Sequence, residues 1–307
     1  MTSHVLVFAP APQLTVTIEQ PADTVEIHVH PGGQGIWQAR MISELGPAVV
    51  MCAALGGEIG HVLRALIAAE GIELRAVTRE ATSGGYVHDR RGGTRSEIAE
   101  VAGEPLNRHE LDDLYSLTLA AALEANVAVL SGPADPSVLP ADTYRRLATD
   151  IGGNGVKVVA DLSGDHLEAV LKGQPYLVKV SHEELIADGR AKDDSEPELL
   201  SALRGLHADG AGAVLVSRAD KGALALLDGE AYEVDSLRLE VADARGAGDS
   251  MTAGVAAVLA QGGDTATAVR TGAAAGALNV TRHGLGSGQA SAVRSLVDRV
   301  SLRRLER

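Results

Sequence analysis

The sequence of 307 residues contains one cysteine, Cys52, so no disulfide bond can form within the chain. This excludes the disulfide framework that holds many small secreted proteins together, and we expect the lone thiol to be a small buried apolar residue. Aromatic residues are also scarce, at 2%. Because 45% of the residues are hydrophobic, the chain can still form a sizeable core, which must be built from aliphatic side chains.

Positively charged residues are also few: the chain has 27 lysines and arginines against 41 acidic residues, which gives a net charge of −14. A nucleic-acid-binding surface needs a basic face, so nucleic acid is not an expected partner. A small nucleotide remains compatible, since it responds to a local site more than to total charge. The N-terminal residues show no secretory signal, and no apolar run approaches membrane-spanning length. We therefore expect a cytoplasmic protein that does not interact with membranes.

Two common nucleotide-binding motifs are missing. The sequence has no Gly-x-x-x-x-Gly-Lys-Ser/Thr, the phosphate loop of many ATPases, and no Gly-x-Gly-x-x-Gly follows the first strand-like run. The ten histidines show no paired spacing typical of a metal cluster. The chemistry must therefore be sought in another part of the chain.

Short apolar runs alternate with helical patterns through most of the chain, which predicts an α/β fold. Runs typical of strands buried on both faces occur at residues 49–54, 127–131, 156–161, 177–180 and 213–217. Helical spacing of apolar residues lies between them, and one such pattern begins just after Asp249 with Met251, Val255 and Leu259. We expect a parallel sheet with helices on both faces, with ligands at the carboxyl ends of its strands.

Two stretches break this alternation. Apolar and polar residues alternate over residues 14–29, and residues 85–101 are polar and rich in glycine. We expect these segments, as lid strands from about 14–30 and 85–101, to form a small sheet over the site, although two surface hairpins would give the same pattern. A small exposed sheet has edges and an apolar face to cover, so we also expect a homodimer that forms through it.

The most informative stretch runs from Asp243 to Asp249 and reads Asp-Ala-Arg-Gly-Ala-Gly-Asp. Its glycines allow a tight turn, and the following helix offers unpaired N–H groups that can hold an anion. Asp249 would then be placed to take a proton from an attacking hydroxyl, as phosphoryl transfer to an alcohol requires. Taken alone, the same residues also fit an ordinary helix start with an acidic cap.

Other motifs in the same order strengthen the first interpretation. They are Gly32-Gly33-Gln34-Gly35, Leu45-Gly46, Leu55-Gly56-Gly57-Glu58-Ile59-Gly60, Ser131-Gly132, Asp161-Leu162-Ser163-Gly164, and the run from Lys179 to Leu185. With residues 243–249, this order resembles the PfkB family of carbohydrate kinases, in particular its phosphofructokinase and tagatose-6-phosphate kinase branch. The resemblance extends over nearly the whole chain.

The resemblance implies a three-layer α/β/α ribokinase-like fold, with a mostly parallel sheet and a small β-sheet lid, in one kinase domain over residues 1–307. It implies an ATP-dependent kinase with Mg²⁺ that phosphorylates an alcohol group of a sugar or sugar phosphate. Asp249 would be the catalytic base, and the backbone N–H groups of Gly246, Ala247 and Gly248 would form the anion hole.

The same resemblance implies positions for the nucleotide and the metals. Five residues would lie near the nucleotide phosphates and ribose: Lys179, Ser217, Arg218, Ala219 and Gly222. Ala275, Gly276 and Asn279 would wall the adenine, although small residues there also fit close helix packing. Glu184 would help to hold Mg²⁺ through water, or would only favour the first turn of a helix. Asp243 would contribute to a site for a monovalent cation such as K⁺.

The acceptor side departs from the family pattern. Gln13 stands where the branch has an aspartate, and Gln34 and Trp37 replace a lysine and an asparagine around Gly33 and Gly35. These residues, together with Ser131, are the predicted acceptor-binding residues. A sugar phosphate needs cations, which Arg90, with Arg91 and Arg95, could supply from the lid, unless these arginines only form a solvated loop.

Three functions therefore remain open. The intact turn before Asp249 favours a kinase for a sugar or sugar phosphate, similar to phosphofructokinase. The altered residues Gln13, Gln34 and Trp37 would suit a kinase of the same fold for a nucleoside or another small alcohol. A non-catalytic metabolite-binding relative is the third alternative, but it would not need a base at residue 249.

Overall fold

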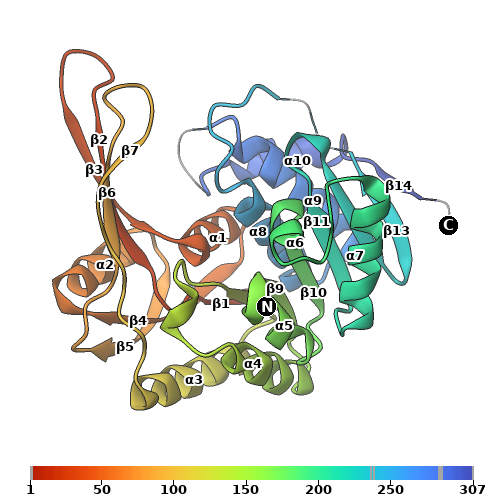
Figure 1. The fold of residues 1–307 in the computed structure, drawn as a ribbon, viewed down its shortest axis with the longest axis horizontal. Helices are drawn as coiled ribbons and strands as arrows, with labels where there is room; N and C mark the ends of the chain where they lie inside the picture. The colour runs from red at the N-terminus through yellow and green to blue at the C-terminus, as the bar shows by residue number, and fades with distance from the viewer. Residues whose placement is uncertain (1–2, 236, 238, 283–285, 306–307) are drawn as a thin grey trace.

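A ten-stranded sheet forms the centre of the computed structural model, which describes residues 3–235, 237, 239–282 and 286–305 (Figure 1). The strand order across the sheet is β14-β13-β12-β11-β10-β9-β8-β1-β4-β5. The strands are β1 (His4–Phe8), β4 (Ala48–Gly56), β5 (Glu73–Arg79), β8 (Val127–Ser131), β9 (Lys157–Asp161), β10 (Leu177–Ser181), β11 (Ala213–Ser217), β12 (Ala223–Leu227), β13 (Glu230–Val234) and β14 (Leu302–Arg304). The seven strands β11, β10, β9, β8, β1, β4 and β5 run parallel to one another, and β12, β13 and β14 continue the sheet with antiparallel pairing.

Helices cover both faces of this sheet, which confirms the predicted three layers. One layer consists of α1 (Gln34–Glu44), α2 (Gly57–Ala69), α8 (Ala247–Ala260), α9 (Thr265–Asn279) and α10 (Ala290–Val297). The other consists of α3 (Arg108–Leu123), α4 (Asp142–Gly153), α5 (Gly164–Leu171), α6 (His182–Ala187) and α7 (Glu196–Ala208). Two short 3₁₀ turns, η1 (Pro136–Val138) and η2 (Ala219–Lys221), follow strands β8 and β11.

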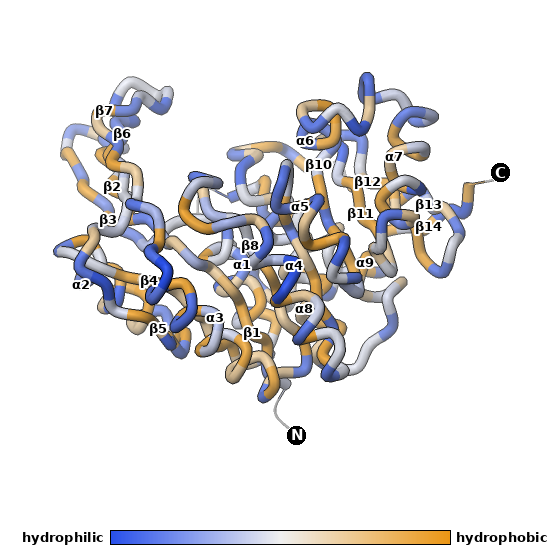
Figure 2. Tube along the Cα trace, turned by 60° about the horizontal axis from the view of Figure 1, so that its bottom comes forward, coloured by the Kyte–Doolittle hydropathy of each residue, from blue (hydrophilic) through white to orange (hydrophobic). Residues whose placement is uncertain are grey.

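The core is aliphatic, as the composition predicts. Figure 2 shows hydrophobic residues along the central strands, and separate buried clusters of Ala, Val, Leu and Ile fill the two faces of the sheet. Cys52 is fully buried, and burial raises the pKa of its thiol to about 11. Among the described residues, no helix has the length and apolar character needed to span a bilayer.

All five strands predicted in the central sheet are present, with ends within two residues of those expected. The sequence reasoning missed the antiparallel edge β12 to β14. The turn between β12 and β13 has a local signature, because Asp228 and Gly229 both adopt left-handed φ, at 50° and 78°. An Asp-Gly pair between apolar runs is typical of a two-residue hairpin, so this signal was available in the sequence.

The second sheet projects from the main body, at the upper left of Figure 1. It contains β2 (Gln13–Glu19), β3 (Glu26–Gly32), β6 (Gly85–Asp89) and β7 (Ser96–Val101) in the order β3-β2-β6-β7. These are the segments that the sequence predicts for the lid. We call this four-stranded sheet the lid sheet.

The two faces of the lid sheet differ in polarity. The strand registers place Thr15, Thr17, Tyr86 and His88 on one face, where both threonines are buried. The other face carries mainly apolar side chains: Val16, Ile18, Ile27, Val29, Val87 and Val101. Because Ile27 is 66% exposed, this apolar face is uncovered in the monomer.

Candidate active site

A cavity of about 1290 Å³ lies at the carboxyl ends of the parallel strands. Residues that follow β8, β9, β10 and β11 line it, together with the N-terminus of α8, one face of α9, and Tyr86 from the lid sheet. The segments predicted for chemistry therefore meet in one place, although they lie far apart in the sequence.

The turn before α8 forms the base of this cavity. Gly246 adopts the left-handed conformation, with φ of 70°, and begins the helix without a side-chain cap in the described chain. The first-turn N–H groups at Ala247, Gly248 and Asp249 are therefore available to an anion. A Cβ on residue 248 would lie 2.5 Å from Lys179 Nζ, so any larger residue there would have to displace this ammonium group.

Asp249 lines the cavity beside these N–H groups. Burial raises the pKa of its carboxyl to about 7, and the nearby carboxylate of Asp161 adds to this rise, while Lys179 opposes it. The side chain of Gln34, which lines the same cavity, also lowers this pKa. A carboxyl group whose pKa lies near neutrality can accept a proton during catalysis and release it again.

Lys179 and Asp161 form a buried ion pair beneath the turn, with Nζ 3.2 Å from Oδ1. Thr252 Oγ1 and Gln38 Nε2 donate to the other Asp161 oxygen at 2.6 and 2.9 Å. Burial lowers the pKa of Lys179, but the carboxylates of Asp161, Glu184 and Asp249 outweigh this effect and raise it. Lys179 therefore stays charged next to the turn before α8.

Sequence reasoning placed Lys179 in the site but missed Asp161, Gln38 and Thr252. Asp161 ends a buried strand at the ligand-binding edge, and this position was the available signal. The predicted acceptor residue Ser131 is fully buried and donates through its hydroxyl to Gln38. It supports this network below the cavity rather than lining it.

On the nucleotide side, the predicted residues Ser217, Ala219 and Gly222 line the cavity. Arg218 does not, because its side chain is buried and pairs with Glu233 on β13. The chain around η2 makes an unusual turn, with φ of 50° at Ala219 and 76° at Gly222.

The face of α9 that meets the cavity contains Gly276, as predicted, together with Ala273 and Ala277, and Val280 at the C-cap of this helix also lines the cavity. Ala275 and Asn279 are fully buried and do not line it. The close packing that sequence analysis left as an alternative is also present, since a Cβ at residue 276 would lie 2.9 Å from the carbonyl oxygen of Ala247.

The two predicted metal ligands differ in their surroundings. Glu184 lines the cavity, and its Oε2 accepts hydrogen bonds from the backbone N and the hydroxyl of Ser181 in a capping box. Asp243 does not line the cavity; it pairs with Arg90 and Arg245. The described residues contain no group of three or more His, Cys, Asp or Glu side chains arranged to hold a metal ion.

The acceptor side combines neutral residues from several elements. Gln13, Gly33, Gln34 and Trp37 line the cavity with Tyr86. Gly35 does not line the cavity and is buried below these residues. It packs closely there, since a Cβ on it would lie 2.5 Å from the Cβ of Ala9. Arg90, expected at an acceptor phosphate, is not a lining residue and pairs instead with Glu19 and Asp243.

The sequence matches the model of the pfkB family carbohydrate kinases over residues 12–292. The chain belongs to the pfkB family of carbohydrate kinases. This pfkB-family protein is therefore an ATP-dependent phosphotransferase with an alcohol group of a carbohydrate as acceptor, as the motifs around Asp249 predict.

Among curated relatives, this pfkB kinase is 29% identical over 283 residues to ATP-dependent 6-phosphofructokinase isozyme 2 of Mycobacterium tuberculosis, covering 89% of the chain and 82% of the relative. Among solved structures, it is similar to phosphofructokinase-2 from Escherichia coli in complex with potassium, with a TM-score of 0.84 and 24% identity over 97% of this chain and 99% of the other. Arabidopsis thaliana ribokinase complexed with ribose and ATP gives a TM-score of 0.76 and 20% identity over 97% and 99% of the two chains. The two structures establish the ribokinase-like fold.

Proposed function

We propose that this kinase transfers the γ-phosphoryl group of ATP to a hydroxyl of a sugar phosphate, with Asp249 as the catalytic base. The observation that carries the proposal is the position of Asp249, whose raised pKa accompanies a free helix N-terminus in the same cavity. A base and an anion hole side by side are the two groups that transfer to an alcohol requires.

In the proposed reaction, the acceptor oxygen forms a bond to the γ-phosphorus while the bond to the β–γ bridging oxygen breaks, and ADP leaves. Asp249 takes the proton of the attacking hydroxyl. The N–H groups at Gly246, Ala247 and Gly248 stabilise the charge that spreads over the transferred oxygens, and Lys179 adds a fixed positive charge below them.

Mg²⁺ bound with the nucleotide would neutralise phosphate charge. The donors present fit this ion, because Glu184 and Asp249 offer carboxylate oxygens to one cavity and Mg²⁺ prefers oxygen ligands while it keeps several waters. Glu184 would hold it through water, since one of its carboxylate oxygens already accepts two hydrogen bonds from Ser181.

A sugar phosphate is the favoured acceptor because the curated relatives are named 6-phosphofructokinase. Arg95 of the lid is the cation that the geometry offers to the phosphate of the acceptor. Its guanidinium lies 5.3 Å from the ring centre of Tyr86, a cavity residue, and its Nε donates to His88 Nδ1 at 3.2 Å. Burial and the neighbouring arginines lower the pKa of His88 to about 4, so this histidine is neutral and can accept.

One observation favours an uncharged acceptor as the second candidate. Lys179 is the only lysine or arginine among the described lining residues, and it lies on the phosphoryl-donor side. The acceptor side presents Gln13, Gln34 and Trp37, which suit the hydroxyl groups and apolar face of a neutral sugar or nucleoside.

We also propose that the kinase works as a homodimer joined through the lid sheet. The exposed apolar face of this sheet supports the proposal, since Ile27 is 66% exposed and Val29 and Val101 are 41% and 49% exposed. Adjacent apolar residues on one exposed sheet face are typical of an interface.

The test is ADP release in the presence of ATP and Mg²⁺, measured with fructose 6-phosphate, fructose, ribose and adenosine as acceptors. We expect turnover with the sugar phosphate and a loss of about 10²–10⁴-fold in Asp249→Asn. The matched control is Asp165→Asn, which changes an exposed acidic residue in the first turn of α5 and should retain full activity. Turnover of adenosine or an unphosphorylated sugar alone would establish the second candidate, and near-normal activity of Asp249→Asn would reject the proposed base.

A further inference from the structure

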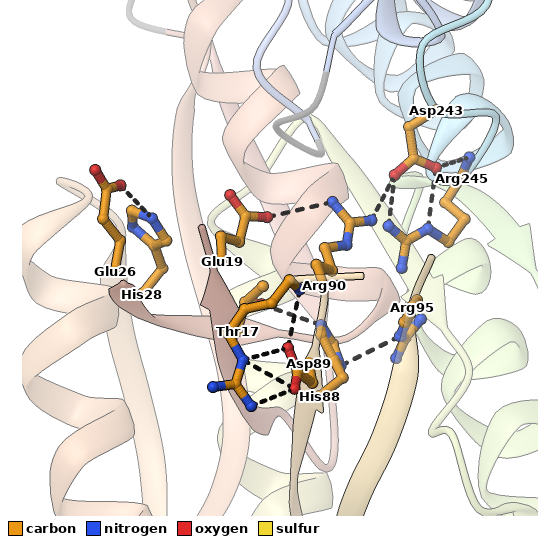
Figure 3. A network of polar contacts seen from close by, with 11 residues as sticks. Thr17, Glu19, Glu26, His28, His88, Asp89, Arg90, Arg95, Asp243 and Arg245 are labelled. Carbon is orange, nitrogen blue, oxygen red and sulfur yellow. Dashed lines mark hydrogen bonds and ion pairs between the residues drawn. The ribbon is translucent and has the colours of Figure 1, made fainter. Parts of the chain in front are cut away.

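The carboxylate of Asp243, which the sequence predicts as a ligand for a monovalent cation, is already occupied by two guanidinium groups (Figure 3). Arg245 donates through Nε to Oδ1 at 3.0 Å and through a terminal nitrogen to Oδ2. Arg90 from the lid donates to Oδ2 at 3.1 Å. The backbone N–H of Arg245 also donates to Oδ1 at 3.1 Å.

The neighbouring carbonyl oxygens are engaged as well. The carbonyl of Arg245 accepts a hydrogen bond from Asn279 Nδ2 at 2.7 Å. The carbonyl of Val280 accepts from the backbone N–H groups of Ala242 and Asp243, at 2.7 and 3.1 Å. A monovalent cation needs several oxygen ligands, and at this place each of these described oxygens already has an N–H partner.

The electrostatics point in the same direction. Hydrogen bonds from Arg245, assisted by Arg90, hold the pKa of Asp243 well below its usual range. Asp243 thus faces two guanidinium groups, and Glu19 pairs with Arg90, so the charges of the cluster are already balanced without a further cation. Entry of a further cation would be repelled by both arginines.

The arginines are held in place from both sides. The backbone N–H of Arg90 donates to Ile18 O at 2.8 Å, and its side chain also lies 3.5 Å from Glu19. Arg245 lies in the turn directly before Gly246. The cluster therefore connects the lid sheet to the anion hole, as Figure 3 shows for Arg90 between Glu19 and Asp243.

We propose that the guanidinium groups of Arg90 and Arg245 replace a monovalent cation beside the anion hole, so that this kinase needs no potassium. Among the described residues, the donor set around Asp243 does not fit such an ion, in contrast to the expectation from the sequence. Arg90 and Arg245 are positioning residues that fix the turn through Asp243. Only the activity measurement of this inference rests on the proposed function, whereas the melting temperature does not depend on it.

The first measurement compares thermal unfolding and ADP release of the full chain in KCl, NaCl and tetramethylammonium chloride at equal ionic strength. We expect the same melting temperature and the same rate in all three salts. A potassium-specific rise of either quantity would overturn the proposal.

The second measurement uses the double substitution Arg90→Ala/Arg245→Ala, which frees Asp243. We expect the rate in tetramethylammonium chloride to fall by about 10–100-fold, because a small displacement of a catalytic group has effects of this size. We expect KCl to restore much of it and to raise the melting temperature of this variant alone. The matched control is Arg91→Ala, since Arg91 pairs with Asp89 on the exposed side of the lid and should not gain a potassium response.

A double variant that loses activity without any potassium response, in rate or in melting temperature, would show that the arginines do not stand in for a cation. If no acceptor is turned over by the unmodified kinase, the proposed function fails, but the melting temperatures still decide the inference. The two failures are therefore distinguishable.

Discussion

The side-chain Oε1 of Gln34 accepts from the backbone N–H of Gly132 at 2.8 Å, and the same side chain lies beside Asp249 in the cavity and lowers the pKa of its carboxyl. Because that carbonyl end is occupied, the amide NH₂ end is the one that faces the carboxylate. A residue at the start of α1 therefore orients the proposed base at the start of α8. The effect of Gln34 on the pKa of Asp249 is smaller than that of burial, which raises it.

Substitutions of Gln34 should move the pKa of Asp249 in opposite directions. In Gln34→Leu the loss of the side-chain amide should raise this pKa above about 7, while the added positive charge of Gln34→Lys should lower it. The readout is the pH at which kcat/KM reaches half its plateau. Gln13→Leu is the matched control, because Gln13 lines the same cavity on the acceptor side and should change KM alone. A shift of both Gln34 variants in one direction would contradict this role.

The activity of the unmodified enzyme should rise with pH, since Asp249 must be ionised to accept a proton. The inflection in kcat/KM should fall near pH 7, because burial raises the pKa of Asp249 to about 7. The measurement is the pH profile with saturating ATP and limiting acceptor. If kcat/KM did not change over about one pH unit on either side of this inflection, Asp249 would be rejected as the titrating base.

The same raised pKa predicts a change in stability. Asp249 has a pKa of 3.8 as an isolated group and about 7 in the fold, so over this window the folded state holds more of its proton than the unfolded state. Its contribution to the free energy of unfolding therefore falls as pH rises from 3.8 to about 7. Asp249→Asn, which cannot ionise, should gain melting temperature over the unmodified protein progressively in this window. If the difference in melting temperature between Asp249→Asn and the unmodified protein were the same at all pH values, the raised pKa of Asp249 would be contradicted.

The sequence predicted the parts of the site that depend on local signals. The glycines and the acidic residue of the turn before α8 mark the proposed anion hole in one short segment, and the apolar runs of β8 to β11 locate the edge of the sheet where the cavity lies. The network of Gln38, Asp161 and Thr252 has no such local signal, because its hydrogen bonds join residues 123 and 91 positions apart.

Two further differences have physical reasons. The residues around Ala275 are nearly all small, so the sequence does not indicate which face of the helix meets the cavity. The cavity-facing residues of α9 therefore differ from those predicted. Arg90 was expected at an acceptor phosphate because of its charge. It pairs instead with Asp243, which lies 153 residues further along the chain and is therefore not identifiable as its partner from the sequence.

Removal of one partner from the buried pair of Asp161 and Lys179 should destabilise the fold, because the other charge is left buried and unpaired. Asp161→Ala leaves the Lys179 ammonium without its nearest carboxylate, which should lower the free energy of unfolding by about 3–5 kcal/mol. Lys179→Met should have a similar effect, since it leaves Asp161 buried beside Glu184 and Asp249. Chemical denaturation of both single variants and of the double variant measures the coupling. A double variant less destabilised than the sum confirms the pair, and strict additivity would show that the two charges act independently.

The apolar face of the lid sheet should determine the oligomeric state. Ile27→Asp places a charge on the most exposed large apolar residue of β3, and burying it in a dimer would cost far more than leaving it in water. We expect sedimentation to show a dimer for the unmodified chain and a monomer for this variant, at unchanged melting temperature of the isolated subunit. The matched control is Leu123→Asp, which alters an apolar residue that is 50% exposed at the end of α3, a helix that packs on the central sheet, and should leave the dimer intact. A dimer that survives Ile27→Asp, or one that Leu123→Asp dissociates, would place the subunit contact outside the lid sheet.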